Sequence, residues 1–281
     1  MAGCTFLRCR GQILGLLVLA GLAFAPVARA DGLASHSVVY DVKAAPSEKE
    51  AYVEAQASFT LTKRCDGWTL GEIFQFGIDK GPAAPAQKKL SDKAERVEER
   101  ATAQETLDGG TLTYQTQLRQ NARLTKATGK ATLGAEPGKL TADLGRYKQD
   151  SVLPAGTLAP GAARAALLAA LIANKPGKIE IPTVDLLRFH KPIVQTFFRL
   201  PPEDPAIART LPKEMRTSDK DFAKGQMWAL LRRVADFNEF GDEHWLMHES
   251  GAIVRQIIQR QGVKLLLEAR EVTLFPAPTC Q

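Results

Sequence analysis

The sequence predicts a mainly β protein of antiparallel strands with one central helix. Through most of the chain, segments rich in β-branched and aromatic residues follow one another with short turns between them. This rhythm is broken once, by an Ala- and Leu-rich stretch from Gly161 to Ala173 that has the composition of a helix. Because short turns join successive strands, neighbouring strands should be antiparallel.

The first half of the chain is expected to consist of strands. They are predicted at Ser37–Val42, Tyr52–Leu61, Trp68–Ile78, Arg96–Leu107, Thr111–Arg119, Arg123–Leu133 and Lys139–Tyr147. Asp108–Gly110 and Glu136–Gly138 are hairpin-turn signals between neighbouring strands. The segment Gln87–Arg100 is charged enough to be read as a helix instead of a strand.

A linking segment with a helix separates this half of the chain from the second half. The extended stretch Ser151–Pro160 leads into the helix, and Asn174–Gly177 ends it. A second set of strands is predicted at Lys178–Ile181, Lys191–Leu200, Gln226–Ala235, His244–Glu249, Ile253–Gln259 and Val263–Phe275. Pro201–Asp221 should be a polar surface excursion. We expect one domain over residues 31–281, with its halves meeting near 151–177. An all-β body of this size usually closes into a barrel or curls into facing sheets, since open edges invite aggregation.

The N-terminus has the three zones of a secretory signal. Arg8 and Arg10 are positive, Ile13–Phe24 is apolar or glycine, Pro26 breaks the helix, and Ala28-Arg29-Ala30 has the small-x-small pattern of a cleavage site. We predict a signal peptide over residues 1–30, cleaved after Ala30. The alternative is an uncleaved anchor, but the apolar run is shorter than the roughly 20 residues that span a bilayer.

Removing the signal changes the charge balance of the chain. The signal contains Arg8, Arg10 and Arg29 and no acidic residue, so 37 − 3 = 34 basic residues face 31 acidic ones and the net charge falls from +6 to +3. This is too mild to favour nucleic acid, whose partners usually have a concentrated basic face. No later apolar run approaches membrane-spanning length, so no transmembrane segment is expected after cleavage.

Cysteine usage gives a second constraint. Cys4 and Cys9 leave with the signal, and Cys65 and Cys280 remain. In an oxidising compartment the two can form one internal disulfide, and the alternatives are free thiols or a bond between chains. Such a bond would tie the last strand to an early one. Cys65 could also be read as an activated nucleophile, but a structural disulfide is the favoured interpretation.

Histidine spacing gives the strongest candidate for a metal site. His244 and His248 are four residues apart, which places both on one face of a helix or a strand. A zinc site needs a third or fourth ligand, and Glu249 does not complete a metalloprotease motif, which has Glu directly after the first His. We interpret the two as surface or cross-strand histidines. His36 and His190 have no evident partner.

Other catalytic patterns are weaker still. Gly-x-Ser-x-Gly is absent, and Glu249-Ser250-Gly251 is typical of a turn. Asp108–Gly110 lacks the helix and lysine of a phosphate loop. The pairs Glu98-Glu99 and Asp242-Glu243 are adjacent, so on strands their members point to opposite faces, and we interpret them as solvated surface. The sequence therefore predicts no catalytic residue, no cofactor and no metal.

Several short motifs, in order along the chain, resemble a known family. The motifs are Ser35-His36-Ser37-Val38-Val39-Tyr40-Asp41, Cys65-Asp66-Gly67-Trp68, Leu153-Pro154-Ala155-Gly156-Thr157 with Pro160, and the terminal Cys280. They are similar to the His-x-x-x-Tyr-Asp, Cys-Asp-Gly-Trp and Leu-Pro-x-Gly-Thr-x-x-Pro elements and the second cysteine of the EipB-type cell-envelope integrity proteins of alphaproteobacteria. That family's Trp-Glu-x-x-Asp-Gly segment is matched in part by Glu105, Asp108 and Gly109, with Gln104 in place of the Trp.

The resemblance implies more than the residues do. It implies a periplasmic, non-enzymatic protein, an antiparallel β-spiral of two curved half-barrel sheets with one central helix, and a Cys65–Cys280 disulfide. It also implies a role in envelope integrity through contacts with other envelope proteins, including one with tetratricopeptide repeats.

Three functions are compatible with the sequence. The first is a periplasmic envelope-integrity protein that acts by binding proteins or envelope components. The second is a carrier whose curved sheet encloses a lipid or another apolar ligand. The third is a hydrolase or metal enzyme that uses His244 and His248.

Overall fold

The computed structural model describes residues 32–82, 84–86, 89–187, 190–235 and 241–280. The predicted signal peptide lies outside the described residues. The strands of the first half are β1 (His36–Ala44), β2 (Ala51–Lys63), β3 (Gly67–Lys80), β4 (Glu95–Thr106), β5 (Thr111–Gln120), β6 (Arg123–Thr132), β7 (Gly138–Asp143) and β8 (Lys148–Leu153). Those of the second half are β9 (Ile179–Asp185), β10 (Lys191–Arg199), β11 (Arg216–Thr217), β12 (Met227–Val234), β13 (Glu243–His248), β14 (Ile253–Arg260) and β15 (Val263–Leu274). The helix α1 spans Pro160–Ile172, and the short 3-10 turns η1 and η2 span Ala84–Ala86 and Phe222–Lys224.

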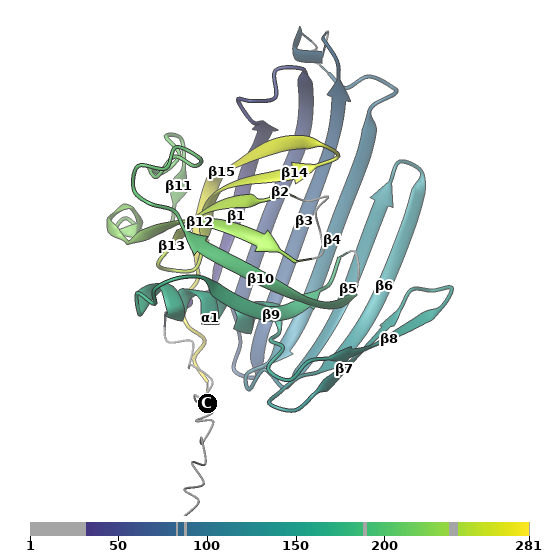
Figure 1. The fold of residues 1–281 in the computed structure, drawn as a ribbon, viewed down its shortest axis with the longest axis vertical. Coiled ribbons are helices and arrows are strands. Elements are labelled where there is room, and N and C mark those ends of the chain that lie inside the picture. The colour runs from purple at the N-terminus through teal and green to yellow at the C-terminus, as the bar shows by residue number, and fades with distance from the viewer. Residues whose placement is uncertain (1–31, 83, 87–88, 188–189, 236–240, 281) are drawn as a thin grey trace, which may run out of the picture.

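The strands form one sheet that does not close. Their order is β8-β7-β6-β5-β4-β3-β2-β1-β15-β14-β13-β12-β10-β9, and β11 pairs with β15 beside this path. Neighbours on the path are antiparallel, as predicted, and β11 pairs with β15 in parallel. The two halves are joined where the first and last strands pair in the middle of the sheet (Figure 1). The fold class is confirmed as mainly antiparallel β with a helix, and the two half-barrels are one continuous curled sheet.

Strand β5 illustrates how the sequence produces this sheet. Leu112, Tyr114 and Thr116 are buried while the residues between them are exposed, as the two-residue period of a strand requires. The preceding hairpin has Gly109 at φ 70°, a conformation that glycine adopts at little cost. The Oδ1 of Asp108 accepts a hydrogen bond of 2.9 Å from the backbone N–H of Gly110, which stabilises the same turn.

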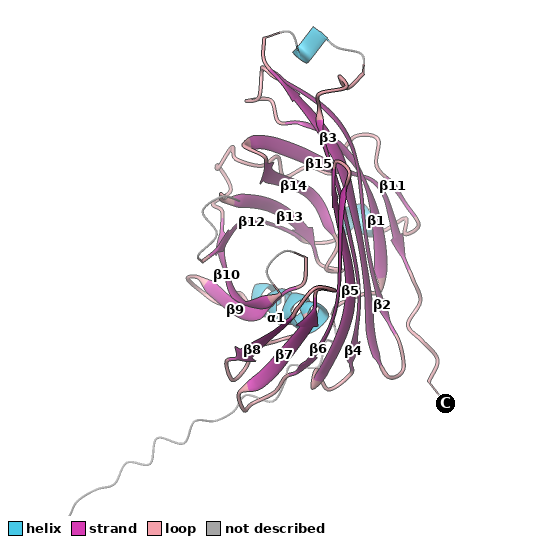
Figure 2. Ribbon diagram, turned by 90° about the vertical axis from the view of Figure 1, so that its right-hand side faces the viewer, coloured by secondary structure: helices cyan, strands magenta, loops and turns pink. Residues whose placement is uncertain are grey.

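Helix α1 lies inside the curl of the sheet (Figure 2). Pro160 is its first residue, where the missing N–H of proline costs nothing. Leu167, Leu168 and Leu171 are almost completely buried, and they pack in one core cluster with residues of β2, β3, β9, β10 and β12–β14. The alanines between them let the helix approach the strands closely. No helix of the described residues is long and apolar enough to cross a membrane.

Three details differ from the sequence prediction. The strand expected at Lys139–Tyr147 ends at Asp143, and the polar segment 148–153 forms the edge strand β8, which composition did not reveal. The helical reading of Gln87–Arg100 is wrong for its second part, because β4 begins at Glu95. Residues 201–221 are more than a surface excursion, since Ile207 is buried in the core cluster that contains Leu246 and Leu265.

Candidate functional site

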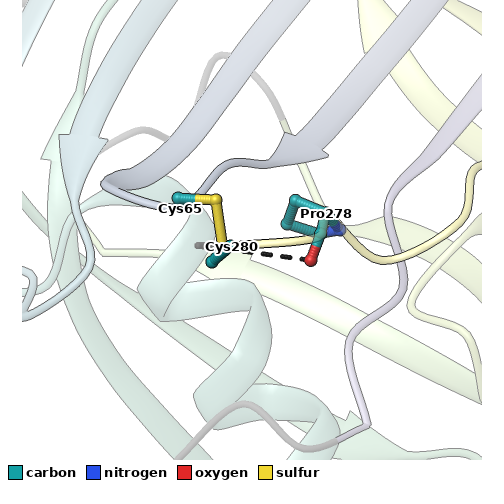
Figure 3. Close-up of a disulfide and its surroundings, with 3 residues drawn as sticks. All are labelled: Cys65, Pro278 and Cys280. Carbon is teal, nitrogen blue, oxygen red and sulfur yellow. Dashed lines mark hydrogen bonds between the residues drawn. A yellow bond between two sulfur atoms is a disulfide. The ribbon is translucent and has the colours of Figure 1, made fainter.

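The Cys65–Cys280 disulfide is present in the structure, with the two Cα atoms 5.4 Å apart (Figure 3). It connects the turn between β2 and β3 to the C-terminal segment that follows β15. The sequence analysis expected a bond between the last strand and an early strand, and this detail is wrong. The Sγ of Cys280 lies 3.9 Å from the carbonyl oxygen of Pro278. Because a disulfide sulfur carries no hydrogen, that contact is not a hydrogen bond, and Cys65 is not available as a nucleophile.

The candidate histidines do not assemble a metal site. His248 is buried, with Nε2 2.9 Å from the carbonyl oxygen of Phe222 and Nδ1 2.9 Å from the Oγ of Ser250. Burial lowers the pKa of both His248 and His244. Within the described ranges no group of three His, Cys, Asp or Glu side chains could hold a metal ion. The prediction of a surface position is wrong for His248, which is 4% exposed and on whose ring the Phe222 ring stacks.

The remaining histidines also have structural contacts. The Nδ1 of His36 lies 2.8 Å from the carbonyl oxygen of Ala34. His190 does have a partner, since its ring stacks on Tyr114 and its Nδ1 lies 3.2 Å from the tyrosine hydroxyl oxygen. Burial lowers the pKa of both imidazoles, to about 4 for His36.

In each of the two adjacent carboxylate pairs, Glu98-Glu99 and Asp242-Glu243, one member is buried. Their members do point to opposite faces, but the inner face of each strand is the interior of the curled sheet. Glu99 is 2% exposed and Glu243 is 6% exposed, whereas Glu98 forms surface ion pairs with Arg100 and Arg119. The prediction that both pairs are solvated is therefore wrong for Glu99 and Glu243.

These two buried carboxylates line an internal cavity of about 270 Å³. The cavity is lined by residues of β1–β4, β9, β10, β12–β15 and α1. Its apolar lining includes Leu70, Phe74, Leu167, Ile181, Ile193, Phe197 and Trp245. Its charged lining comprises Glu72, Glu99, Arg164, Asp185, Arg232, Glu243 and Arg260.

On the β12–β14 side the charges neutralise one another. Glu243 on β13 lies between two guanidiniums, with Nη1 of Arg232 at 2.5 Å and Nη1 of Arg260 at 3.7 Å. The Nε of Arg232 also donates to Gln195 Oε1 at 3.0 Å. Burial acts to raise the pKa of Glu243, but the two arginines outweigh it and lower this pKa below its usual value. This triad is a compensated structural unit.

On the other side the charges are not matched in this way. Burial, followed by the neighbouring Glu99 carboxylate, raises the pKa of Glu72 on β3. Arg164 projects from α1, with its guanidinium carbon 4.1 Å from the centre of the Phe59 ring. Its Nη1 donates a hydrogen bond of 3.2 Å to the carbonyl oxygen of Gly251.

Tyrosine and glutamine add polar groups to the same lining. The Tyr40 hydroxyl donates to the carbonyl oxygen of Ile253 at 2.7 Å and accepts from Gln256 Nε2 at 3.2 Å. Burial raises the pKa of Tyr40 to about 12, so this hydroxyl stays protonated. The cavity therefore combines apolar walls with a few fixed polar groups, as small-molecule binding sites do.

The sequence analysis did not identify Glu72 and Arg164 as candidate site residues, although the sequence contains a signal for each. Glu72 occupies an inward position of β3, in register with the apolar residues Leu70 and Phe74. Arg164 is the single charged residue in the Ala- and Leu-rich sequence of α1. A charge placed on an otherwise apolar face is the pattern that points to a functional lining.

Comparisons with known proteins agree with this architecture. The family model described as EipB-like matches residues 27–176, which is 150 of 281 residues and just over half of the chain. The chain belongs to the EipB-like family. Its structure is similar to the crystal structure of a beta-barrel-like protein of the domain of unknown function DUF1849 from Brucella abortus, with a TM-score of 0.68 and 13% identity over 87% of this chain and 99% of that one. At that identity the likeness concerns the fold alone. No curated protein sequence matches the chain.

Proposed function

We propose that the protein is a non-enzymatic periplasmic binding protein that supports cell-envelope integrity. The observation that carries the proposal is the internal cavity, whose apolar walls and unmatched charges suit an envelope component as ligand. Family membership supports the assignment to the envelope. The histidine contacts supply no case for the alternative of a hydrolase or metal enzyme.

The proposed periplasmic location has independent physical support. A disulfide across 215 residues of sequence persists in an oxidising compartment and not in the cytoplasm. We expect the protein isolated from cells to begin at Asp31 and to be oxidised. Intact-mass measurement of the periplasmic fraction checks both, and a mass that retains residues 1–30 would contradict cleavage after Ala30.

Deletion of the gene is the direct test of the envelope role. The deletion strain should become more sensitive to detergent and to cell-wall antibiotics, and the unaltered gene should restore resistance. Equal sensitivity of the deletion and parent strains would reject the role. A periplasmic pull-down with the oxidised protein tests the proposed envelope-protein partners, including one with tetratricopeptide repeats.

A second candidate function is a carrier for a lipid or another apolar ligand. It is favoured by the apolar part of the cavity lining, to which β9, β10 and α1 contribute. Native mass spectrometry of protein purified from cells should then reveal a bound adduct that disappears on denaturation. Repeated absence of an adduct would count against a carrier and leave a protein-binding role to be tested by the pull-down.

A further inference from the structure

The position of Arg164 costs free energy, because its charge is partly removed from water. It interrupts an apolar helix, and its side chain lines the cavity inside the sheet. Burial lowers the pKa of its guanidinium, which reflects the cost of removing a charge from water. A residue chosen only for packing at this position would be apolar, as its neighbours on α1 are.

The contacts of Arg164 within the protein use little of its bonding capacity. The guanidinium carbon lies over the Phe59 ring, and among the described residues the guanidinium donates one hydrogen bond, to the carbonyl oxygen of Gly251. A guanidinium carries more N–H donors than this bond uses, and they are arranged as a fork that matches a carboxylate or a phosphate. The contact with the Phe59 ring and the bond to Gly251 hold the guanidinium in the cavity lining.

The Glu72 carboxyl acts electrostatically on the Arg164 guanidinium. Glu72 lines the same cavity, but the described residues include no ion pair between the two side chains. Burial and the Glu99 carboxylate raise the pKa of Glu72, which shifts this group toward its neutral form, a hydrogen-bond donor. In contrast, Arg232 and Arg260 both have Glu243 as counter-ion.

The space beside Arg164 is apolar. Leu70, Leu167, Ile181 and Phe197 line the same cavity. Its volume of about 270 Å³ is close to the lower end of the roughly 300–1,000 Å³ that is typical of ligand pockets. This space fits a short hydrocarbon chain and excludes a folded peptide.

We infer that Arg164 binds the anionic head of a small amphipathic ligand, a carboxylate or a phosphate, whose hydrocarbon chain lies against the apolar lining. This inference rests on the proposed binding function and names the ligand class of the same cavity. The Glu72 carboxyl and the Tyr40 hydroxyl lie in the same lining to contact further oxygen atoms of the head group.

Isothermal titration calorimetry of the oxidised protein with model ligands at neutral pH tests the inference. Octanoate and octyl phosphate combine an anionic head with a chain, octan-1-ol supplies the chain alone, and inorganic phosphate supplies the head alone. We expect one of the two charged amphiphiles to bind about tenfold or more tightly than octan-1-ol, as a charge-assisted hydrogen bond implies. Equal affinity for octanoate, octyl phosphate and octan-1-ol would overturn the anionic head. Equal affinity for inorganic phosphate and octyl phosphate would overturn the amphipathic ligand in favour of a free anion.

Variants locate the site. Arg164→Met should abolish the preference for the charged amphiphile over octan-1-ol, while Arg164→Lys should retain part of it. Arg233→Met is the matched control, because Arg233 is exposed and is bound by Asp242 through two hydrogen bonds of 2.8 and 2.7 Å. If Arg164→Met keeps the preference, the inference is wrong. If that variant does not fold, Arg164→Lys and the wild-type ligand series still decide the question.

The gene-deletion experiment separates the two proposals. A sensitive deletion strain together with no anion preference leaves the envelope role standing and rejects the inference. An insensitive deletion strain rejects the envelope role, and the calorimetry then judges the anion site by itself.

Discussion

Glu243 and Glu72 line the same cavity from different strands, yet their environments act on them in opposite directions. Glu243 on β13 has two arginine counter-ions, and its pKa is lowered. Glu72 on β3 has burial and the Glu99 carboxylate as its main influences, and its pKa is raised. Glu243 is buried and Glu72 is half-buried, and burial acts to raise both pKa values, so burial alone cannot explain the difference.

The difference lies in what each charge is matched with. A buried ion pair is costly to assemble and very costly to break. The β12–β14 side contains such a set, formed by Glu243 with Arg232 and Arg260. On the other side, Glu72 and Arg164 line the cavity, and their hydrogen-bonding groups can contact a ligand there.

Breaking the matched set should have the largest effect. Glu243→Ala leaves the half-buried Arg232 and Arg260 without their shared carboxylate, so the free energy of unfolding should fall by about 3–5 kcal/mol. Urea denaturation followed by tryptophan fluorescence measures the loss. Glu72→Ala is the matched control on the other side and should cost much less; equal losses would remove the distinction between the two sides.

Removing the disulfide tests how much it stabilises the part of the sheet that contains Glu72, since Cys65 lies in the turn that leads into β3. The double variant Cys65→Ser, Cys280→Ser should lose about 2–5 kcal/mol, because cross-linking restricts the unfolded chain. Calorimetric unfolding of the oxidised and variant proteins gives the difference. Cys280→Ser alone should behave like the double variant, and an unchanged unfolding temperature would show that the bond is dispensable.

A third carboxyl, Glu105, sharpens the comparison because, within the part of the chain that the structure describes, no cationic side chain is hydrogen-bonded to it. It is 7% exposed, and its Oε2 accepts from the backbone N–H of Gly161 at the start of α1 at 3.2 Å. Burial raises its pKa from 4.5 to about 7, against the effect of the hydrogen bonds from Gly161 and Ala162.

The raised pKa of Glu105 determines the sign of its pH effect. The folded protein binds the proton more tightly than the unfolded chain, so the stability contribution is fully present below pH 4.5 and is lost as the pH rises to about 7. The loss should be on the order of 3 kcal/mol. Glu105→Gln should remove this slope in urea denaturation measured from pH 4 to 8. The control Glu98→Gln should leave the slope above about pH 5.5 unchanged, because hydrogen bonding to Arg100 lowers the pKa of Glu98 and this group is ionised in both states there.

Replacing Glu72 by Gln should have the smallest effect. Because its folded pKa is raised, the ionised form is destabilising, and Glu72→Gln should increase the free energy of unfolding at pH 8 and leave it nearly unchanged at pH 4. The increase should be smaller in size than the loss caused by Glu243→Ala. A decrease at pH 8 would mean that ionised Glu72 is paired, as Glu243 is.

Much of the fold could be predicted from sequence because its determinants are local. Alternation defined β5, an Ala- and Leu-rich composition defined α1, and turn residues such as Gly109 separated the strands. Strand β8 was missed because its sequence is polar, since it lies at the edge of the sheet. The site was missed for a different reason: adjacent glutamates such as Glu98 and Glu99 look equally solvated until the curvature of the sheet is known.

The sequence by itself determined the order and type of nearly all elements, the two cysteines available for pairing, and the motifs shared with the EipB-like family. These follow from backbone preferences, periodicity and composition, which act over a few residues. Only the tertiary structure decided that the first and last strands pair in the middle of the sheet and that the sheet curls around α1. It also decided that Arg164 and Glu72 line one cavity while Glu243 is neutralised by Arg232 and Arg260. Their charges act through space, so their pKa values and roles depend on neighbours that lie far away in the sequence.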